Sequence, residues 1–489
     1  MDITLAKKKS FLKRINVPTR SSALFTVSGI ITKGAALLFT PIFTRLLSSS
    51  EYGTYSLFNS YLSVLVVLGT LEIGSGASLR AFQRYRGREY TVILTAFLLT
   101  LPSCVIALLT LALLRSVTGG EGLFAGAFPL LLITVLSSGI INLVTARAKF
   151  LYKPAIAILL SLISGVLAPV ISIFLISLGA ARSYSRAAIK VASSSFVLLL
   201  CAVSLLLRTV FMAKKELCSL APKERYYLIK ECGRLLFRLS LPLLPYYFSV
   251  MAISQADKLA VSRYLGAPSL GAYSVAYSTG LAPVCITQGI ICALTPWVMR
   301  KVRGKDYAKV RATVNSAFSI LCALISLFLI AAPEIFSFLA PEEYRSSLPV
   351  TFIIALAPLP LFLMNIESSV MCAYERTLPT VLTGGAVSVV SVAACYLLTP
   401  RLGFTSSAIC VLASYVTVAT VQAINIRRLP CRSIFGTAKC VGAFLLTAIF
   451  SFGILALRGT PSVRIALAVL PLASLVYMLS KARELLRDK

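Results

Sequence analysis

Apolar stretches of about 20 residues recur along the whole chain and are separated by short charged loops. A helix rises 1.5 Å per residue, so a stretch of this length crosses a hydrocarbon core of roughly 30 Å. Only 13% of the 489 residues are charged, whereas about a quarter are charged in a typical soluble domain. The sequence therefore predicts an all-α polytopic membrane protein.

Counting these stretches predicts about fourteen transmembrane helices. Lys and Arg are concentrated in every second loop, and the positive-inside rule places those loops and both termini in the cytoplasm. One predicted outer loop, 180–190, breaks the alternation because it contains Arg182, Arg186 and Lys190. The predicted spans are residues 22–44, 54–78, 91–114, 123–145, 154–179, 187–211, 239–262, 270–299, 313–339, 347–371, 379–399, 403–426, 437–457 and 461–480.

Two short segments of the chain repeat at a constant spacing. Residues 45–47 and 53–56 recur as residues 263–265 and 271–274, each shifted by 218 positions. Six predicted spans separate the copies, an even number, so both copies lie on the same side of the membrane. This pattern is a parallel repeat of the kind found in transporters whose binding site lies at the repeat interface. We therefore expect two pseudo-symmetric lobes around a central cavity.

The longest connection between spans divides the chain in its middle. It is charged and contains Pro222, but leucine and tyrosine side chains give it an apolar side, which is typical of a helix lying at the membrane surface. The predicted domains are an N-terminal lobe at 1–211, a cytoplasmic amphipathic connection at 212–236, a C-terminal lobe at 237–426 and an additional helix pair at 427–489.

The first predicted helix contains a single charged residue, Lys33, near its middle. On a helical wheel Lys33 shares one narrow stripe with polar residues such as Thr40 and Thr44. An ionisable residue at this depth costs roughly 2.5–3.5 kcal/mol on insertion scales. We therefore expect Lys33 to face the protein interior or a water-filled cavity.

Four further charged residues fall within predicted spans: Glu72, Asp257, Lys258 and Glu367. They favour a partly acidic, partly cationic cavity for a charged head group, with one carboxylate coupled to an ion. The alternative is structural pairing between helices, for example of Lys33 with Glu72. Asp257 and Lys258 are neighbours in a helix and point about 100° apart, so they are not expected to pair with each other.

Four uncharged or interfacial residues complete the candidate site. Arg45 and Arg263 lie where a span leaves the membrane, where ligand binding and interfacial anchoring explain them equally well. Gln255 and Gln288 have the hydrogen-bonding groups to bind sugar hydroxyls, and hydrogen bonding between helices is the alternative.

Several classes of function are disfavoured by what the sequence lacks. It contains no histidine and no CxxC spacing, so we expect no metal site, and we expect the cysteines to be small buried thiols. No Walker motif is present, and no long outer loop is available for a catalytic domain, which argues against an enzyme. The formal net charge of +31 arises from the basic loops rather than from a nucleic-acid-binding patch.

The opening of the chain carries a recognisable motif. Lys33-Gly34 is followed by a Pro-x-x-T-R-x-L segment at 41–47 and an E-Y-G-x-Y turn at 51–55, and residues 257–274 and 338–344 add further agreement. The chain resembles the polysaccharide-exporter branch of the multidrug/oligosaccharidyl-lipid/polysaccharide superfamily, the O-antigen flippase type. The resemblance covers nearly the whole chain.

The resemblance implies fourteen helices in two lobes and the movement of an undecaprenyl-pyrophosphate-linked oligosaccharide across the bacterial cytoplasmic membrane. Lys33 is the first candidate for the pyrophosphate contact. No cofactor is expected. Transport is expected to be coupled to Na⁺, to H⁺ or to the membrane potential. Expected partners are the lipid-linked substrate, membrane lipids and proteins of polysaccharide polymerisation and export. A lipid II flippase, a multidrug or cation antiporter and, less favoured, a glycan polymerase or ligase remain alternatives.

Overall fold

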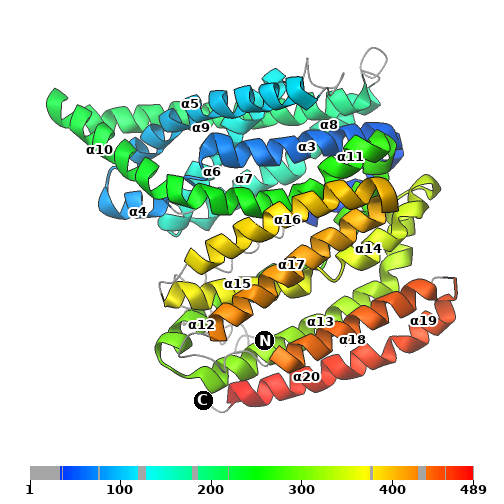
Figure 1. Ribbon diagram of the computed structural model, residues 1–489. Coiled ribbons are helices and arrows are strands. Elements are labelled where there is room, and N and C mark those ends of the chain that lie inside the picture. Colours follow the sequence, from blue (N-terminus) through cyan, green and yellow to red (C-terminus); the bar gives the residue numbers. More distant parts are fainter. Residues whose placement is uncertain are drawn as a thin grey trace, which may run out of the picture. The chain divides into compact units, whose positions relative to one another are not determined.

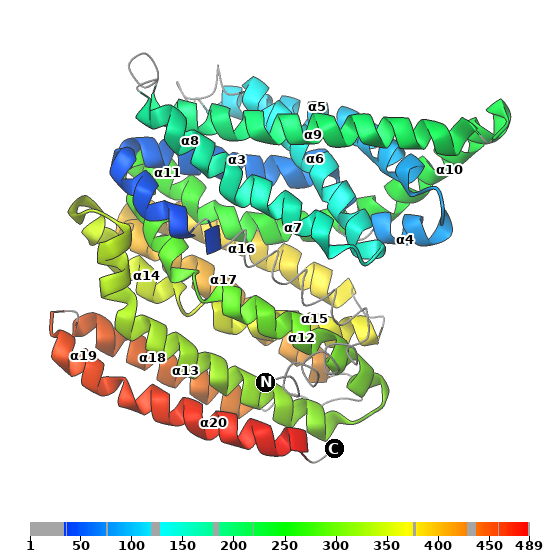
Figure 2. The ribbon, with the colours of Figure 1, turned by 180° about the vertical axis from the view of Figure 1, so that it is seen from behind.

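The apolar stretches form helices throughout the part of the chain that the structure describes, and that part contains no strand. Ten of its helices are long and apolar enough to cross a membrane, and the bent pair of α11 and α12 makes an eleventh candidate (Figures 1 and 2). Of the first predicted span, Leu37–Leu46 forms a short apolar helix. The computed structural model describes residues 34–35, 37–74, 77–118, 128–178, 185–218, 220–374, 378–427, 437–457 and 459–487.

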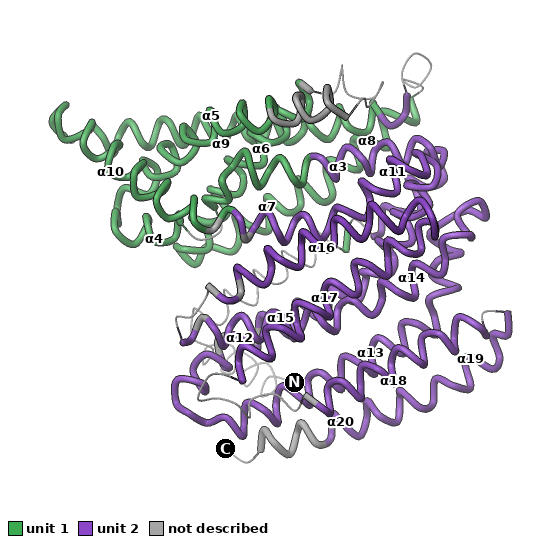
Figure 3. The backbone as a smooth tube through the Cα atoms, in the orientation of Figure 1, with its two compact units in different colours: residues 1–35, 62–184, 188–244 green, residues 36–61, 185–187, 245–489 purple. Residues whose placement is uncertain are grey.

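The chain divides into two compact units (Figure 3). Unit 1 comprises Met1–Ala35, Leu62–Tyr184 and Ala188–Leu244. Its helices are the second part of α3 (Ser49–Thr70), α4 (Ala77–Arg84), α5 (Glu89–Thr118), α6 (Phe128–Phe150), α7 (Pro154–Leu162), α8 (Ala168–Ser177), α9 (Arg186–Cys218) and α10 (Pro222–Ser240).

A buried apolar cluster holds one end of unit 1 together. Phe82 of α4, Ile93 of α5 and Leu236 of α10 are fully or almost fully buried in it. Helix α10 is amphipathic: Cys232 and Leu236 face this cluster, while Lys230 on its other side is exposed. Burial of one apolar face against neighbouring helices explains why this charged segment is helical.

The N-terminus of α5 is capped by a residue from another helix. Glu216 of α9 accepts hydrogen bonds from the backbone N–H groups of Tyr90 and Thr91 at 3.2 and 2.8 Å. The Thr91 hydroxyl donates to the same carboxylate at 2.7 Å. The first N–H groups of a helix lack partners within the helix and attract negative charge, so this contact fixes α5 against α9.

Unit 2 comprises Ala36–Tyr61, Ser185–Ala187 and Pro245–Lys489. A turn at Gly266, which has φ 81° and ψ 175°, divides α11 into two helical halves. The bend between α11 and α12 is 43°. The main helices of unit 2 are α11 (Leu244–Gly280), α12 (Val284–Arg303), α13 (Tyr307–Leu339), α14 (Leu348–Ile354), α15 (Pro358–Ala373), α16 (Leu378–Leu402), α17 (Phe404–Arg427), α18 (Thr437–Ala456), α19 (Pro461–Leu467) and α20 (Val469–Arg487).

The two copies of the sequence repeat meet within unit 2. Gly53 lies so close to the carbonyl group of Ala267 that an added Cβ would overlap its oxygen, and Gly271 lies equally close to the carbonyl group of Ser49. These two contacts are related by the same shift of 218 positions. A reciprocal contact of this kind is what a local two-fold axis produces. The start of α3 and the second half of α11 accordingly lie side by side (Figures 1 and 2).

The basic loop that broke the charge alternation has a structural explanation in part. Arg186 donates a side-chain hydrogen bond to the Leu46 carbonyl at 2.7 Å, and its backbone N–H donates to Glu51 at 3.0 Å. Arg186 thereby satisfies a carbonyl at the end of the 37–46 helix.

Candidate functional site

Asp257 lies on the first half of α11 and is completely buried. The hydroxyl of Tyr273 donates a hydrogen bond of 2.6 Å to its Oδ2 atom. Tyr273 lies on the second half of α11. It reaches Asp257 because the chain turns at Gly266 between the two halves. The other oxygen, Oδ1, has no hydrogen-bond partner among the described residues. Burial of a carboxyl group with one unused acceptor is costly, so this residue is a candidate for a functional role.

Lys258, the next residue, faces a different set of groups. Its Nζ lies 4.6 Å from the ring centroid of Tyr277 and 3.5 Å from Oε1 of Gln255. The aromatic ring and the amide oxygen stabilise the ammonium group in place of water. No ion pair joins Lys258 to Asp257 within the described part of the chain, in agreement with their predicted divergence on the helix.

The side of α11 around Asp257 is covered by small apolar groups. Ala256 and Ala260 pack with Cys395 of α16 and Cys410 of α17 in one buried cluster. These two cysteines are small buried thiols, as predicted from the sequence, and most of the ten cysteines whose side chains the structure describes are likewise buried or half-buried. The described residues contain no cluster of histidine, cysteine or acidic side chains that would hold a metal ion.

Glu367 of α15 is the second deeply buried carboxyl group of unit 2, with 2% of its surface exposed. Its Oε2 atom has no hydrogen-bond partner among the described residues. Gln288 is half-buried on α12, which packs against α15. The structure thus groups Gln255, Asp257 and Lys258 on α11, whereas Glu367 and Gln288 lie on other helices.

The two candidate arginines lie at helix ends and are exposed. Arg45 donates a hydrogen bond of 3.2 Å to the Phe338 carbonyl, and its guanidinium group lies 5.9 Å from the centroid of the Phe338 ring. Thr44, beside it, donates to the Leu339 carbonyl at 2.7 Å. These bonds tie the end of the 37–46 helix to the end of α13, so Arg45 has a structural role in addition to any contact with ligand.

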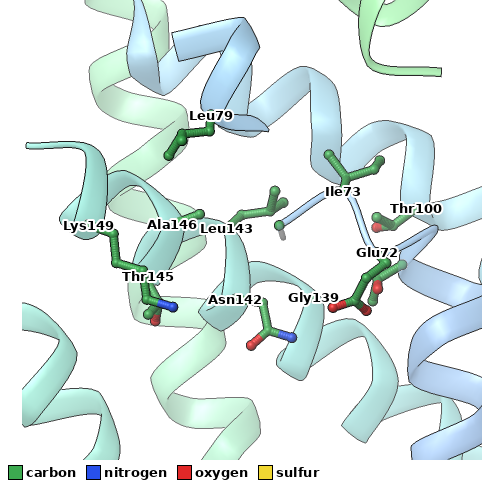
Figure 4. A pocket seen from close by; sticks show the side chains of 12 residues that line it. Glu72, Ile73, Leu79, Thr100, Gly139, Asn142, Leu143, Thr145, Ala146 and Lys149 are labelled. Atoms are coloured by element: carbon green, nitrogen blue, oxygen red, sulfur yellow. The ribbon is translucent and has the colours of Figure 1, made fainter. Parts of the chain in front are cut away.

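Glu72 lines a pocket of about 250 Å³ in unit 1 (Figure 4). The predicted second span was expected to continue to residue 78, but α3 ends at Thr70. Leu71 and Glu72 then adopt left-handed backbone conformations with φ of 49° and 46°. This turn places the Glu72 side chain in the pocket, opposite α6.

The rest of the pocket combines polar and apolar side chains in similar numbers. Asn142, Thr145 and Lys149 of α6 follow one another at helical spacing along one face, and Thr70 and Thr100 add hydroxyl groups. Figure 4 shows Asn142 between Glu72 on one side and Thr145 and Lys149 on the other.

Lys33, the first candidate from the sequence, lies outside the described residues, so its place in the cavity stays a prediction and its pairing with Glu72 stays the alternative. Neither Tyr273, the partner of Asp257, nor the polar face of α6 was predicted from the sequence. The same holds for Arg464, which is 3% exposed and donates to Glu334 and to the Ile330 carbonyl. The sequence does contain a signal for this residue, because a charged side chain near the start of the last predicted span, 461–480, needs a partner when it is buried.

Comparison with solved structures shows the same fold in membrane transporters. The lipid II flippase MurJ in an inward closed conformation has a TM-score of 0.62 at 15% identity, covering 95% of this chain and 99% of that chain. A multidrug resistance MATE family transporter of the MOP superfamily has a TM-score of 0.56 at 15% identity, with coverage of 90% and 97%. A MOP superfamily transporter from Pyrococcus furiosus gives 0.53 at 15% identity, with coverage of 89% and 96%.

Among curated protein sequences, none matches this chain. The family model described as "Polysaccharide biosynthesis protein" matches residues 19–302, more than half of the chain. The match covers the opening motif, the sequence repeat and the buried residues of α11. The chain therefore belongs to the polysaccharide biosynthesis protein family, in the polysaccharide-transporter branch of the multidrug/oligosaccharidyl-lipid/polysaccharide superfamily.

Proposed function

We propose that this multi-pass membrane protein is a flippase that moves an undecaprenyl-pyrophosphate-linked oligosaccharide across the bacterial cytoplasmic membrane by alternating access. The observation that carries the proposal is the family match over residues 19–302, which includes buried ionisable residues in membrane helices. Asp257 is completely buried and Lys258 has its ammonium group against an aromatic ring. Ionisable groups at such depth are rare unless they serve transport.

The chemistry of the substrate fits the candidate residues. A pyrophosphate group cannot enter hydrocarbon unaided, because an unpaired charge there is very costly. Lys33 is proposed to neutralise it, with Lys258, Arg45 and Arg263 as further cations. Gln255 and Gln288 are proposed to bind sugar hydroxyls.

The carboxyl groups are the proposed coupling sites. Asp257 and Glu367 each have one oxygen without a hydrogen-bond partner in the described part of the chain. A bound Na⁺ or a proton would satisfy these oxygens, and release of that ion would then accompany transport. Coupling to the membrane potential is the alternative source of energy, and no cofactor is proposed.

The proposed arrangement in the membrane has about fourteen helices with both termini in the cytoplasm. Its lobes are residues 1–211 and 237–426, joined by the connection at 212–236 and followed by the helix pair at 427–489. The glycan would pass afterwards to the proteins of polymerisation and export. The chain is proposed to transport and not to catalyse a reaction.

The test is the surface glycan of a deletion strain, together with the sidedness of its undecaprenyl-pyrophosphate oligosaccharides. We expect loss of surface glycan and complete repeat units held on the inner leaflet, both restored by the wild-type gene. Complete but unpolymerised units on the outer leaflet would instead show a polymerase or ligase. Lipid II held on the inner leaflet would show a peptidoglycan flippase, and an unchanged glycan profile would favour a drug or cation antiporter.

A further inference from the structure

The pocket of unit 1 is lined by groups that suit a ligand rich in hydroxyl groups. The carboxyl group of Glu72 accepts hydrogen bonds, the ammonium group of Lys149 donates them, and the amide of Asn142 and the hydroxyls of Thr145 and Thr70 do both. A sugar ring carries adjacent hydroxyls that each donate and accept. We propose that this pocket binds one sugar unit of the transported glycan, an inference that rests on the proposed function.

The size of the pocket limits what it can hold. Its volume of about 250 Å³ equals that of about eight water molecules at their liquid volume of about 30 Å³ each. One pyranose ring fits this space, whereas an oligosaccharide does not. The pocket is therefore a subsite for a single sugar unit, and the remainder of the glycan lies outside it.

The charges argue for a sugar rather than a metal cation. Glu72, Asn142 and the threonines would supply oxygen ligands, but Lys149 places a positive charge in the same pocket. A cation site is also compact, because ligand oxygens surround the ion at 2.3–2.6 Å for a typical hard cation such as Ca²⁺. A pocket with room for about eight waters and with a lysine at one end does not meet this requirement.

The backbone around Glu72 supports a binding role. Leu71 and Glu72 are consecutive residues with positive φ, a conformation that strains the backbone of residues other than glycine. Strain of this kind persists where the surrounding structure imposes it, and it is concentrated at functional sites. Here it directs the Glu72 carboxyl group into the pocket, while close packing of Gly74 and Gly139 brings the turn against α6.

Under the proposed topology this pocket lies on the cytoplasmic side, because α4 and α6 end in basic residues there, including Arg84 and Lys149. The sugar unit would therefore bind before the glycan crosses the membrane. The pocket would select glycans by one of their sugars, and the candidate cations would hold the pyrophosphate.

The experiment measures binding of methyl glycosides to the full-length protein in nanodiscs by saturation-transfer-difference NMR. The panel contains the methyl glycosides of glucose, galactose, mannose, N-acetylglucosamine, N-acetylgalactosamine and glucuronate. We expect at least one of them to bind the wild-type protein. Glu72→Gln replaces a charged acceptor by a neutral amide, and Asn142→Ala removes an amide that both donates and accepts. Each substitution should therefore weaken that binding about tenfold. Leu79→Trp, which fills the pocket, should abolish it.

The matched control is Glu231→Gln, which neutralises an exposed glutamate of the same unit in a surface ion pair with Arg234. It should bind the glycoside as tightly as the wild type does, and all variants should share its melting temperature. The inference is overturned if no glycoside binds, or if binding survives all three pocket substitutions. Binding of ²³Na⁺ that Glu72→Gln removes, without glycoside binding, would show a cation site instead.

The outcomes separate this inference from the proposed function. The water-soluble probes carry no lipid and need no transport, so glycoside binding is independent of flipping. A deletion strain with stranded glycan and a protein that binds no glycoside would overturn only the sugar subsite. Glycoside binding together with an unchanged surface glycan in the deletion strain would overturn the flippase assignment, and with it the transported glycan as the source of the sugar, but not the sugar-binding pocket itself.

Discussion

Ser56 and Ser274 share a hydrogen bond of 2.5 Å between their hydroxyl oxygens, although 218 residues separate them. This is the spacing of the sequence repeat, so the two serines are equivalent positions of its two copies. Equivalent residues touch each other only where a two-fold axis passes between them. Gly53 and Gly271 make the reciprocal backbone contacts beside this pair, and the repeat is therefore a packing element as well as a sequence pattern.

This contact predicts that alanine at either glycine disrupts folding. A Cβ atom at Gly53 would overlap the Ala267 carbonyl oxygen, and one at Gly271 would overlap that of Ser49. Backbone atoms cannot move aside cheaply, so Gly53→Ala and Gly271→Ala should each cost about 3 kcal/mol or more and reduce the yield of monodisperse protein. Size-exclusion chromatography and thermal melting in detergent check this. Gly442→Ala, where nothing lies within 4 Å of the added atom, should behave like the wild type.

Loss of the ion pair between Arg464 and Glu334 should lower the free energy of unfolding more than loss of an ion pair at the surface. Arg464 is buried, so Glu334→Gln leaves a buried guanidinium group without its charged partner. We expect a loss of about 2 kcal/mol, below the 3–5 kcal/mol of fully buried pairs because Glu334 is half exposed. The unfolding midpoint in detergent checks this value. The exposed pair of Arg345 and Glu342 is the control, and Glu342→Gln should change stability by less than about 0.5 kcal/mol. Equal effects at both pairs would contradict the prediction.

Tyr273→Phe should destabilise the protein through Asp257. The substitution removes the hydroxyl that donates to Oδ2 and leaves a buried acceptor unsatisfied, at a cost of about 1–3 kcal/mol. Asp257→Asn in the same chain should recover part of this loss, because a neutral amide is less costly to bury than a carboxylate. A double-mutant cycle of melting temperatures measures the coupling between the two residues. Tyr477→Phe, at an exposed tyrosine of α20, should be neutral, and additive effects of Tyr273 and Asp257 would argue against the bond.

The cysteines of α9 and α10 predict a contrast in reactivity. Burial raises the pKa of the Cys232 thiol to about 12, so on the order of one thiol in ten thousand is ionised at pH 8, and the thiolate is the reactive form. A variant with Cys232 as its single cysteine should therefore resist maleimide at pH 8, and labelling should begin only on unfolding. A variant with only Cys218, which is exposed, should react. In intact cells an impermeant maleimide should not reach Cys218, and labelling from outside would refute the proposed topology.

Lys33→Ala should abolish or strongly reduce glycan export while the protein remains in the membrane at its normal level. The physical reason is the loss of the positive charge proposed to neutralise the pyrophosphate. Surface glycan and membrane abundance are measured in a deletion strain carrying the variant. Lys439→Ala, at an exposed lysine of α18, controls for loss of a lysine in general. Normal export by the Lys33 variant would remove this residue from the mechanism.

Residue order along the chain was enough to predict several features of the structure. The apolar stretches are helices wherever the structure describes them, and the repeat at 218 positions is the spacing of the Ser56–Ser274 bond. The divergence of Asp257 and Lys258 follows from the 100° step of a helix and is seen in their different contacts. Each of these properties depends on residues that are neighbours in sequence or on a simple periodicity.

Other features depended on contacts between distant residues. Tyr273 reaches Asp257 because the chain turns back at Gly266, and Glu72 enters its pocket because two residues adopt positive φ after α3. Hydropathy records only whether a segment prefers lipid or water, so it was enough to predict which segments are membrane-spanning helices. Which polar side chains meet inside them is decided by the turns and close glycine contacts of the tertiary structure, because a hydrogen bond forms only within about 3 Å.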